Sequence, residues 1–248
     1  MLVLDQMSFS FPSRPVLSGI SVNCDAGETI GFVGKSGIGK TTLLNLIAGY
    51  LAGFSGRIAI GGVEPAEAAR KQKIGFIFQT PALIPWLTVR QNVSLPLKLH
   101  NDRSGGMEDK VDASLRRARI SHAERLLPHQ LSGGMQTRAA IARTIAYDPH
   151  VLLMDEPFTG LDDIIKEEIF MELQTRWLES EAANVLVSHD LSEVTRLCNR
   201  VYVLRAHEGS ACQIVHCEDI DLKRPRGIDV LEHAEFLAAR RRIWEHLQ

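Results

Sequence analysis

The chain has 248 residues, of which 45% are hydrophobic and 23% charged, an ordinary composition for a single α/β domain with a full core. Its 28 Lys and Arg nearly balance its 30 Asp and Glu, and a net charge of -2 gives no long-range field to gather nucleic acid or anionic lipid. Residues 1–5 lack the basic start of a signal peptide, and no apolar run reaches the roughly 18 residues that cross a bilayer. We therefore expect a cytoplasmic protein with no nucleic acid partner.

The first 80 residues predict a β-rich start and the first strand of a buried sheet. Residues 2–25 alternate in polarity and carry turn residues at 11–13, as an antiparallel β-region does. Short apolar runs then alternate with helical patterns along the chain, which indicates an α/β core with a mostly parallel sheet. The expected strands are Thr29–Val33, Ile74–Phe78, Val151–Met154, Val185–Val187 and Val201–Leu204, and the expected helices are Lys40–Ala48, Gly133–Ala146, Ile164–Glu179 and Leu191–Leu197.

Between Pro81 and Pro128 the strand signal disappears, so this segment is expected to be an inserted α-helical subdomain with a loose polar stretch at Asn101–Gly106. We expect a single domain over residues 1–248. Its parts are a core of 1–80 and 150–215, a helical subdomain of 81–149, and a tail of 216–248. The tail ends in a basic helix, Ala234–Leu247, whose arginines we interpret as a solvated face rather than a membrane contact.

The cysteines are scattered and form no CxxC pair, which is typical of free thiols in a reducing compartment. Cys212, His216 and Cys217 lie close together in the sequence. Because the stretch Ser210–Cys217 alternates as a strand does, we reject a zinc site there.

The strongest motif is Gly34-Lys35-Ser36-Gly37-Ile38-Gly39-Lys40-Thr41, which fits the phosphate-loop pattern G-x-x-x-x-G-K-[ST]. It follows an apolar strand and leads into a helix, as that pattern requires. Its glycines let backbone N–H groups point at phosphate oxygens. Lys40 is expected to reach the β- and γ-phosphates and the Thr41 hydroxyl to ligate Mg²⁺.

A second motif places two carboxylates, Asp155 and Glu156, at the end of the apolar run Val151–Met154. Ligands of parallel α/β sheets bind at this end of the strands. Asp155 is expected to hold Mg²⁺ and Glu156 to act as general base on the attacking water. The alternative is that both acids cap a following helix.

A third motif, Leu131-Ser132-Gly133-Gly134-Met135-Gln136, begins a predicted helix. A helix N-terminus is a second phosphate-binding device, which one chain does not need around the same nucleotide. The motif is therefore expected to face the ATP of another molecule, although Ser132 also suits a simple N-cap.

With these motifs in this order, nearly the whole chain resembles the ATPase subunits of ABC transporters. Residues 131–136 resemble the signature motif of that family, with Met135 where Gln is usual, and Lys35 stands where many members have Pro or a small residue. The resemblance implies further site residues: Phe11, or alternatively Phe9, stacking on adenine, Thr42 beside Thr41 at the phosphates, Gln79 at Mg²⁺ and the water, Leu161-Asp162 crossing the dimer interface, and His189 gripping the γ-phosphate.

The resemblance also implies how the chain works. Two ATPase chains, identical or paralogous, would sandwich ATP between the phosphate loop of one and Ser132–Gly134 of the other. Integral membrane permease subunits are the expected partners, and the chain is expected to bind them on the cytoplasmic face of the plasma (inner) membrane. Leu83 and Trp86 are the expected contacts; alternatively, these residues form the core of the helical subdomain. The cofactors are ATP and Mg²⁺.

Within the tail, Asp219–Arg226 and the helix residues Arg240–Trp244 resemble importer ATPases of the nitrate, sulfonate and taurine group, as do Pro85–Val89 and Leu131–Gln136 with its Met. A solute-binding protein would be an indirect partner of such an importer. An exporter or lipid-trafficking ATPase would share the nucleotide chemistry. A soluble ABC-type ATPase acting on DNA or ribosomes is a third alternative. Members of that class usually carry coiled coils or zinc modules, and neither is visible in this sequence. A regulator without hydrolysis is disfavoured because Glu156 and His189 are both present.

Overall fold

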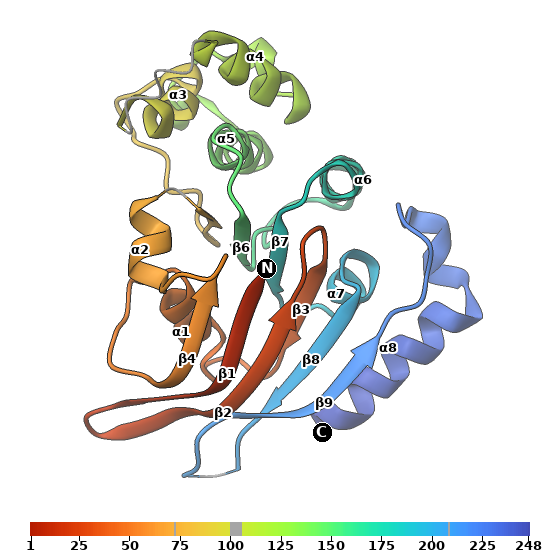
Figure 1. Cartoon of the computed structure of the whole chain (residues 1–248). Helices are drawn as coiled ribbons and strands as arrows, with labels where there is room; N and C mark the ends of the chain where they lie inside the picture. The colour runs from red at the N-terminus through yellow and green to blue at the C-terminus, as the bar shows by residue number, and fades with distance from the viewer. Residues whose placement is uncertain (72, 100–105, 208) are drawn as a thin grey trace.

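A six-stranded sheet forms the centre of the computed structural model, which describes residues 1–71, 73–99, 106–207 and 209–248 (Figure 1). The strand order is β5-β6-β7-β3-β8-β9, with only the edge strand β9 antiparallel to its neighbour. The mostly parallel sheet confirms the predicted fold class. Its strands are β3 (Thr29–Val33), β5 (Ile74–Ile77), β6 (Val151–Asp155), β7 (Ala183–Val187), β8 (Arg200–Arg205) and β9 (Gln213–Asp219).

The predicted antiparallel region is also confirmed and forms a second sheet. In it β1 (Leu2–Phe11) lies between β2 (Arg14–Cys24) and β4 (Ser55–Ile60). The β1–β2 turn falls at residues 12–13, as the sequence indicates. β4 and the short helix α2 (Pro65–Arg70) are two elements that sequence reasoning did not predict.

Both faces of the central sheet are covered, because successive side chains of its buried strands point to opposite sides. In β6, Val151 and Leu153 join a core shared with the antiparallel sheet and α1 (Lys40–Ile47). Leu152 and Met154 join a second core with the helices of the other face. Those helices are α5 (Gly133–Ile145), α6 (Asp163–Glu179), α7 (Leu191–Leu197) and α8 (Ala234–Leu247).

A third hydrophobic cluster holds a helical lobe together, seen beside the central sheet in Figure 1. It is formed by α3 (Val89–Leu99), α4 (Met107–Arg117) and one side of α5, with 3₁₀ turns at Ser121–Ala123 and Pro128–Gln130. Of the predicted polar stretch, Asn101–Gly105 lie outside the described residues, and Gly106 is the N-cap of α4. In the part of the chain that the structure describes, no helix is long and apolar enough to cross a membrane.

A buried arginine of the tail, Arg226, lies just before the 3₁₀ turn Ile228–Glu232 and helps to attach the tail to the core. Its side chain is 2% exposed. The guanidinium donates hydrogen bonds to five backbone carbonyls, those of Thr195 (2.8 Å), Arg196 (3.2 Å), Cys198 (2.7 Å), Ile220 (2.9 Å) and Leu222 (2.8 and 3.1 Å). These bonds tie the end of α7 to the chain after β9.

Arg226→Met is expected to lower the free energy of unfolding by at least about 3 kcal/mol, because several buried carbonyls lose their donor together. Urea denaturation followed by circular dichroism measures the effect. The matched control is Lys223→Met at an exposed neighbouring position, expected to stay within about 0.5 kcal/mol of the unmodified chain. Equal stability of the two variants would contradict the anchoring role of Arg226.

Candidate active site

A cleft of about 300 Å³ opens at the carboxyl ends of β3 and β6, beside the tip of the β1–β2 hairpin. This is the edge of a parallel sheet at which ligands bind. Most of the residues predicted to contact ATP or Mg²⁺ within one chain meet there. The cleft is lined by Phe11, Arg14, Val16, Ser36, Gly37, Gly39, Lys40, Thr41, Thr42, Gln79, Asp155 and Glu156.

The predicted phosphate loop connects β3 to α1 and directs the helix N-terminus into this cleft. Gly37 and Gly39 have φ values of 74° and 117°, which favour glycine, and Gly39 is the N-cap of α1. A Cβ on Gly39 would lie 2.9 Å from Val16 Cγ1, so the hairpin packs directly on the loop. The exposed helix N–H groups suit an anionic ligand.

The other three residues of the loop do not line the cleft. A Cβ on Gly34 would lie 2.8 Å from the carbonyl oxygen of Leu204, so this glycine is required for close packing. Ile38 packs against the core, and Lys35 is exposed at the rim.

Lys40 is 6% exposed and folds back onto its own loop. Its Nζ donates to the carbonyl oxygens of Gly34 at 2.8 Å and Lys35 at 3.1 Å. Burial lowers the pKa of Lys40, against the opposing charges of Glu156 and Asp155. The Lys40 ammonium is buried, and its hydrogen-bond acceptors are backbone carbonyls rather than carboxylates. It is therefore suited to bind an incoming anion.

Asp155 ends β6 and is 8% exposed. Burial raises the pKa of its carboxyl, a hydrogen bond with the Thr41 side chain opposes that shift, and the charge of Glu156 adds to it. The carboxylate therefore lies in a setting that an additional positive charge would stabilise.

Glu156 contacts two other predicted site residues, each from a separate segment of the chain. Its carboxylate Oε2 lies 3.0 Å from His189 Nδ1 and 3.4 Å from Gln79 Nε2. Its backbone is held at φ 45°, an uncommon conformation for a non-glycine residue, while its N–H donates to the Val187 carbonyl at 2.9 Å. Such strain is often found where a side chain must be aimed.

The helix-capping alternative for the two acids is excluded. The next helix, α6, begins at Asp163, and its N-cap is Asp162, whose Oδ1 accepts the Ile165 N–H at 3.0 Å. Neither Asp155 nor Glu156 caps it.

The structure distinguishes the two candidate aromatics. Phe11 lines the cleft and is 43% exposed, whereas Phe9 is 7% exposed and belongs to the core. The two rings meet edge to face with centroids 5.0 Å apart. Arg14 and Val16, which line the same cleft, were not predicted. In the structure Arg14 pairs with Phe11 across the hairpin.

The predicted signature motif lies outside the cleft. Ser132 caps α5 by accepting the Met135 N–H at 3.3 Å, and both it and Gly133 are exposed. Gly134 is buried, and a Cβ there would lie 2.9 Å from Ile165 Cδ1 on α6. The turn therefore packs against the first turn of α6, which follows Leu161 and Asp162.

The candidate permease contacts lie in the loop before α3. Trp86 is 75% exposed, whereas Leu83 is partly buried against the cluster of the helical lobe. Asn92, fully buried, holds this loop through hydrogen bonds to Ile84 N (2.7 Å), Ile84 O (3.2 Å), Leu87 O (3.0 Å) and Thr88 O (3.0 Å). The loop is a fixed platform for an exposed indole.

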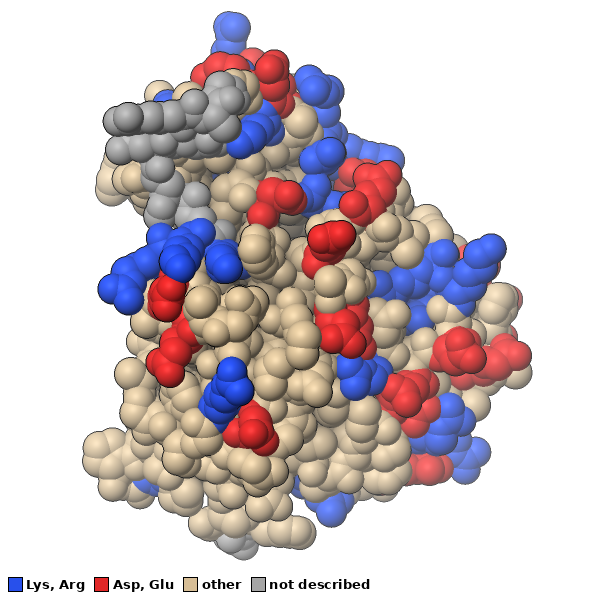
Figure 2. Space-filling model, viewed as in Figure 1, with Lys and Arg blue, Asp and Glu red and all other residues tan. Residues whose placement is uncertain are grey.

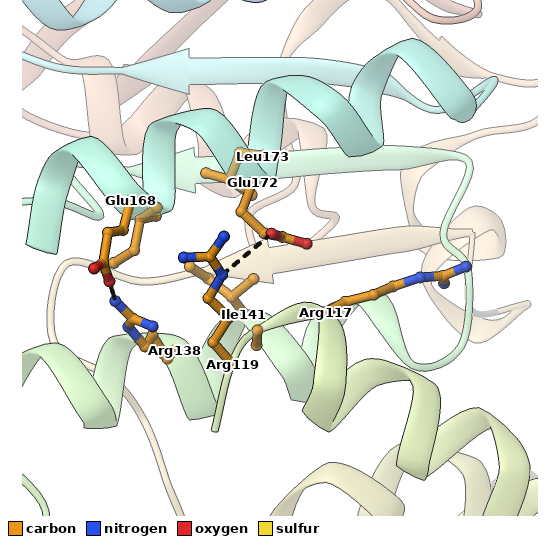
Figure 3. A pocket seen from close by; sticks show the side chains of 9 residues that line it. Arg117, Arg119, Arg138, Ile141, Glu168, Glu172 and Leu173 are labelled. Atoms are coloured by element: carbon orange, nitrogen blue, oxygen red, sulfur yellow. Dashed lines mark hydrogen bonds and ion pairs between the residues drawn. The ribbon is translucent and has the colours of Figure 1, made fainter. Parts of the chain in front are cut away.

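The joint between the helical lobe and α6 encloses a cavity of about 20 Å³, large enough for a water molecule only (Figure 3). Two ion pairs flank it, Arg138 with Glu168 and Arg119 Nε with Glu172 at 3.8 Å. It is a structural joint rather than a ligand site.

Cys212 is buried and Cys217 exposed, while His216 bonds Glu218 at 3.1 Å and stacks on His246 with centroids 3.8 Å apart. Within the described ranges no group of three or more His, Cys, Asp or Glu could hold a metal ion. Figure 2 shows acidic and basic side chains interspersed on the face viewed.

A strand-loop-helix with a buried lysine, and two carboxylates at the end of a parallel strand, define a P-loop NTPase core. The helical lobe is inserted between these two motifs and contains the Ser132–Gly134 turn before α5. This insertion distinguishes the chain from other P-loop NTPases. The sequence profile of the ABC transporter family matches residues 17–159. The chain belongs to this family, as an ATP-binding subunit and ABC-type ATPase.

Relatives and solved structures agree. The aliphatic sulfonates import ATP-binding protein SsuB of Bacillus licheniformis is 37% identical, over 85% of this chain and 80% of its own length. A putative ATP-binding protein of Brucella abortus is 36% identical, over 92% and 86%. The dimeric structure of the bacterial ABC transporter cassette MJ0796 has a TM-score of 0.75 at 30% identity, covering 90% of this chain and all (100%) of that one. The predicted similarity to sulfonate-type importer ATPases is confirmed.

Proposed function

We propose that this chain hydrolyses ATP at the interface of a head-to-tail dimer and thereby drives import of a small solute through separate permease subunits. The observation that carries the proposal is the separation of two nucleotide-binding elements. The cleft around Lys40 contains the phosphate loop but not the Ser132-Gly133 turn of the same chain. That turn is exposed and could cover the cleft of a partner chain. A cassette of similar fold is dimeric.

Within one chain, the phosphate loop binds the nucleotide. We assign the phosphates to the loop from Gly34 to Thr42, with the Lys40 ammonium exchanging its carbonyl partners for phosphate oxygens. Phe11 offers an exposed ring for the adenine. The same similar cassette, MJ0796, has also been solved with ADP and Pi, which supports this placement of ATP.

Hydrolysis is assigned to the cluster around Glu156. Its carboxylate takes a proton from the attacking water, while Gln79 orients that water and His189 contacts the γ-phosphate. The 3.0 Å contact with His189 holds the carboxylate in place before substrate arrives.

Magnesium fits the donor set of the cleft. Thr41, Gln79 and Asp155 offer a hydroxyl, an amide and a carboxylate oxygen, the ligands that Mg²⁺ prefers. Bound there, Mg²⁺ would neutralise charge on the phosphate oxygens.

The dimer contacts are assigned to residues 131–134 and 161–162, which lie on neighbouring turns because Gly134 packs on Ile165. We further propose that residues 81–149 act as one helical subdomain on a core of 1–80 and 150–215, with 216–248 as tail. The lobe presents Trp86 to a permease at the cytoplasmic face of the membrane.

The solute is proposed to be a small sulfonate-type anion, by similarity to relatives that are sulfonate import ATP-binding proteins. A solute-binding protein and the permease would make the contacts to it. This chain would supply the ATP-driven motion.

Affinity purification from native membranes tests the assembly. The unmodified chain is expected to recover an integral membrane partner, and Trp86→Ala to reduce that recovery by at least about tenfold, since an exposed aromatic anchor commonly dominates an interface. Trp244→Ala, at a tryptophan 53% exposed on α8, is the matched control and should recover the partner normally. Mass spectrometry of the partner identifies the transport system, and recovery of none would contradict the proposal.

A further inference from the structure

A chain of polar side chains, buried at Ser188 and Glu193 and half-buried at Lys166, connects the start of α6 to the segment that carries His189. Lys166, on the first turn of α6, donates from Nζ to Glu193 Oε1 at 2.9 Å. The other oxygen of Glu193, on α7, accepts the hydroxyl of Ser188 at 2.6 Å. None of these three residues touches the ATP cleft.

Ser188 fixes the backbone on both sides of His189. Its hydroxyl oxygen accepts the Asp190 N–H at 3.0 Å, and its own N–H donates to the Phe32 carbonyl at 3.3 Å. Asp190 in turn caps α7 by accepting the Ser192 N–H at 2.7 Å. Because Glu193 accepts the Ser188 hydroxyl hydrogen, it sets the direction in which that oxygen faces Asp190. The orientation of residues 188–190 thus depends on Glu193.

The other end of the chain of contacts lies at the proposed dimer interface. The Lys166 N–H donates to the Asp162 carbonyl at 2.9 Å, and the Asp162 side chain caps the same helix. A displacement of residues 161–162 therefore moves Lys166, and with it the partner of Glu193.

Burial makes this connection strong and specific. Ser188 is 1% exposed and Glu193 6% exposed. Burial lowers the pKa of Lys166, but the hydrogen bond and charge of Glu193 outweigh it, together with Asp190 and Asp163, so that the pKa is raised overall. Fully satisfied buried polar networks fix one geometry, and a missing member leaves a costly unpaired group.

We propose that Glu193 is a positioning residue that aims His189 at the γ-phosphate, and that Lys166 couples this aim to the dimer contact at Leu161 and Asp162. The inference rests on the proposed function of His189. Through these contacts, a partner chain that docks at the start of α6 would affect the position of His189 in the chain to which it docks.

The chain offers a matched control one residue away. Glu167 on α6 pairs with Arg196 on α7 at 2.8 Å, joining the same two helices, and Arg196 is 5% exposed. This pair has no bond to residues 188–190 and bonds instead to the Arg226 carbonyl at 3.0 Å. It carries helix packing without the connection to His189.

Steady-state ATP hydrolysis by the full chain tests the proposal. Glu193→Gln is expected to lower kcat by about tenfold or more, because a small misplacement of a contact to the transition state is costly, with KM for ATP changed by less than about twofold. Glu167→Gln should leave kcat within about twofold of the unmodified chain. Ser188→Ala, which removes the same link without an unpaired charge, should resemble Glu193→Gln.

A double-mutant cycle separates positioning from general destabilisation. In a His189→Ala background, Glu193→Gln should lower the residual kcat by less than about twofold, because the group it aims is already gone. A full tenfold effect there, or equal effects of Glu193→Gln and Glu167→Gln on kcat, would overturn the proposal. Either of these two outcomes would overturn the role of Glu193 but not the proposed function. The proposed function itself would fail if Glu156→Gln retained normal turnover.

Discussion

Glu156→Gln is expected to lower ATP turnover by at least about 100-fold, the usual minimum for removal of a general base. The amide has nearly the shape of the carboxylate and can still meet Gln79 and His189, but it cannot take a proton from water. Nucleotide binding depends on the phosphate loop, which the change leaves intact. ATP should therefore bind and remain unhydrolysed, so that the closed dimer accumulates.

Phosphate release measures the turnover, and size-exclusion chromatography with light scattering in ATP and in ADP measures the dimer. The expected pattern is a dimer with ATP only. The control is Glu181→Gln, at an exposed carboxylate that precedes β7, the strand whose other end leads to His189; this variant should retain normal turnover. Unchanged turnover of the Glu156 variant would contradict the assignment of this residue as base.

Ser132→Arg is expected to abolish the ATP-dependent dimer while leaving nucleotide binding to the monomer within about twofold, because this residue lies outside the cleft of its own chain. The long guanidinium would occupy the exposed turn that is proposed to approach a partner's phosphates. Turnover should fall with the dimer, since each site lacks its second half.

Fluorescent nucleotide titration measures binding, and light scattering measures association. Ser132→Ala separates the two effects of the change, because it removes the N-cap of α5, at about 1 kcal/mol, without adding bulk. It should still dimerise. Loss of nucleotide binding by the Ser132→Arg monomer would show that the turn had been placed in the wrong site.

Much of the fold could be predicted from local pattern. The buried strands β3, β6 and β7 are apolar at nearly every position, and the glycine loop marks the junction of β3 with α1. β4 was missed because its first half is exposed and its second half buried, so it shows neither alternation nor an apolar run long enough to be recognised. Its pairing with β1 joins residues more than fifty positions apart, Leu2 with Ile60, which no local pattern encodes.

The site residues were found by motif, but their contacts were not. Spacing and resemblance indicated Gln79, Glu156 and His189 separately, whereas the meeting of all three depends on the order of β5, β6 and β7 in the sheet. Arg14 was missed because a single charged residue after a turn carries no distinguishing signal. The choice between Phe9 and Phe11 could not be made from strand alternation, since residues two apart in a strand share a face; Phe9 is buried in the core, whereas Phe11 is exposed at the end of β1.

Buried polar residues with structural tasks were equally hidden. Asn92, Glu193 and Arg226 read in the sequence as ordinary helix or loop polar residues, yet all are nearly or fully buried. Their partners are backbone groups or side chains of other elements. Such residues are defined by the tertiary structure and not by a motif.

The close fit of Gly134 against Ile165 has a consequence for timing. A Cβ on Gly134 would lie only 2.9 Å from Ile165 Cδ1, so we expect the glycine turn and the first turn of α6 to move together. In the proposed two-fold dimer each chain would offer this paired unit to its partner, so we expect motion at one nucleotide to reach the segment that borders the other. We expect the two sites to close in synchrony, as a single event that both nucleotides must permit.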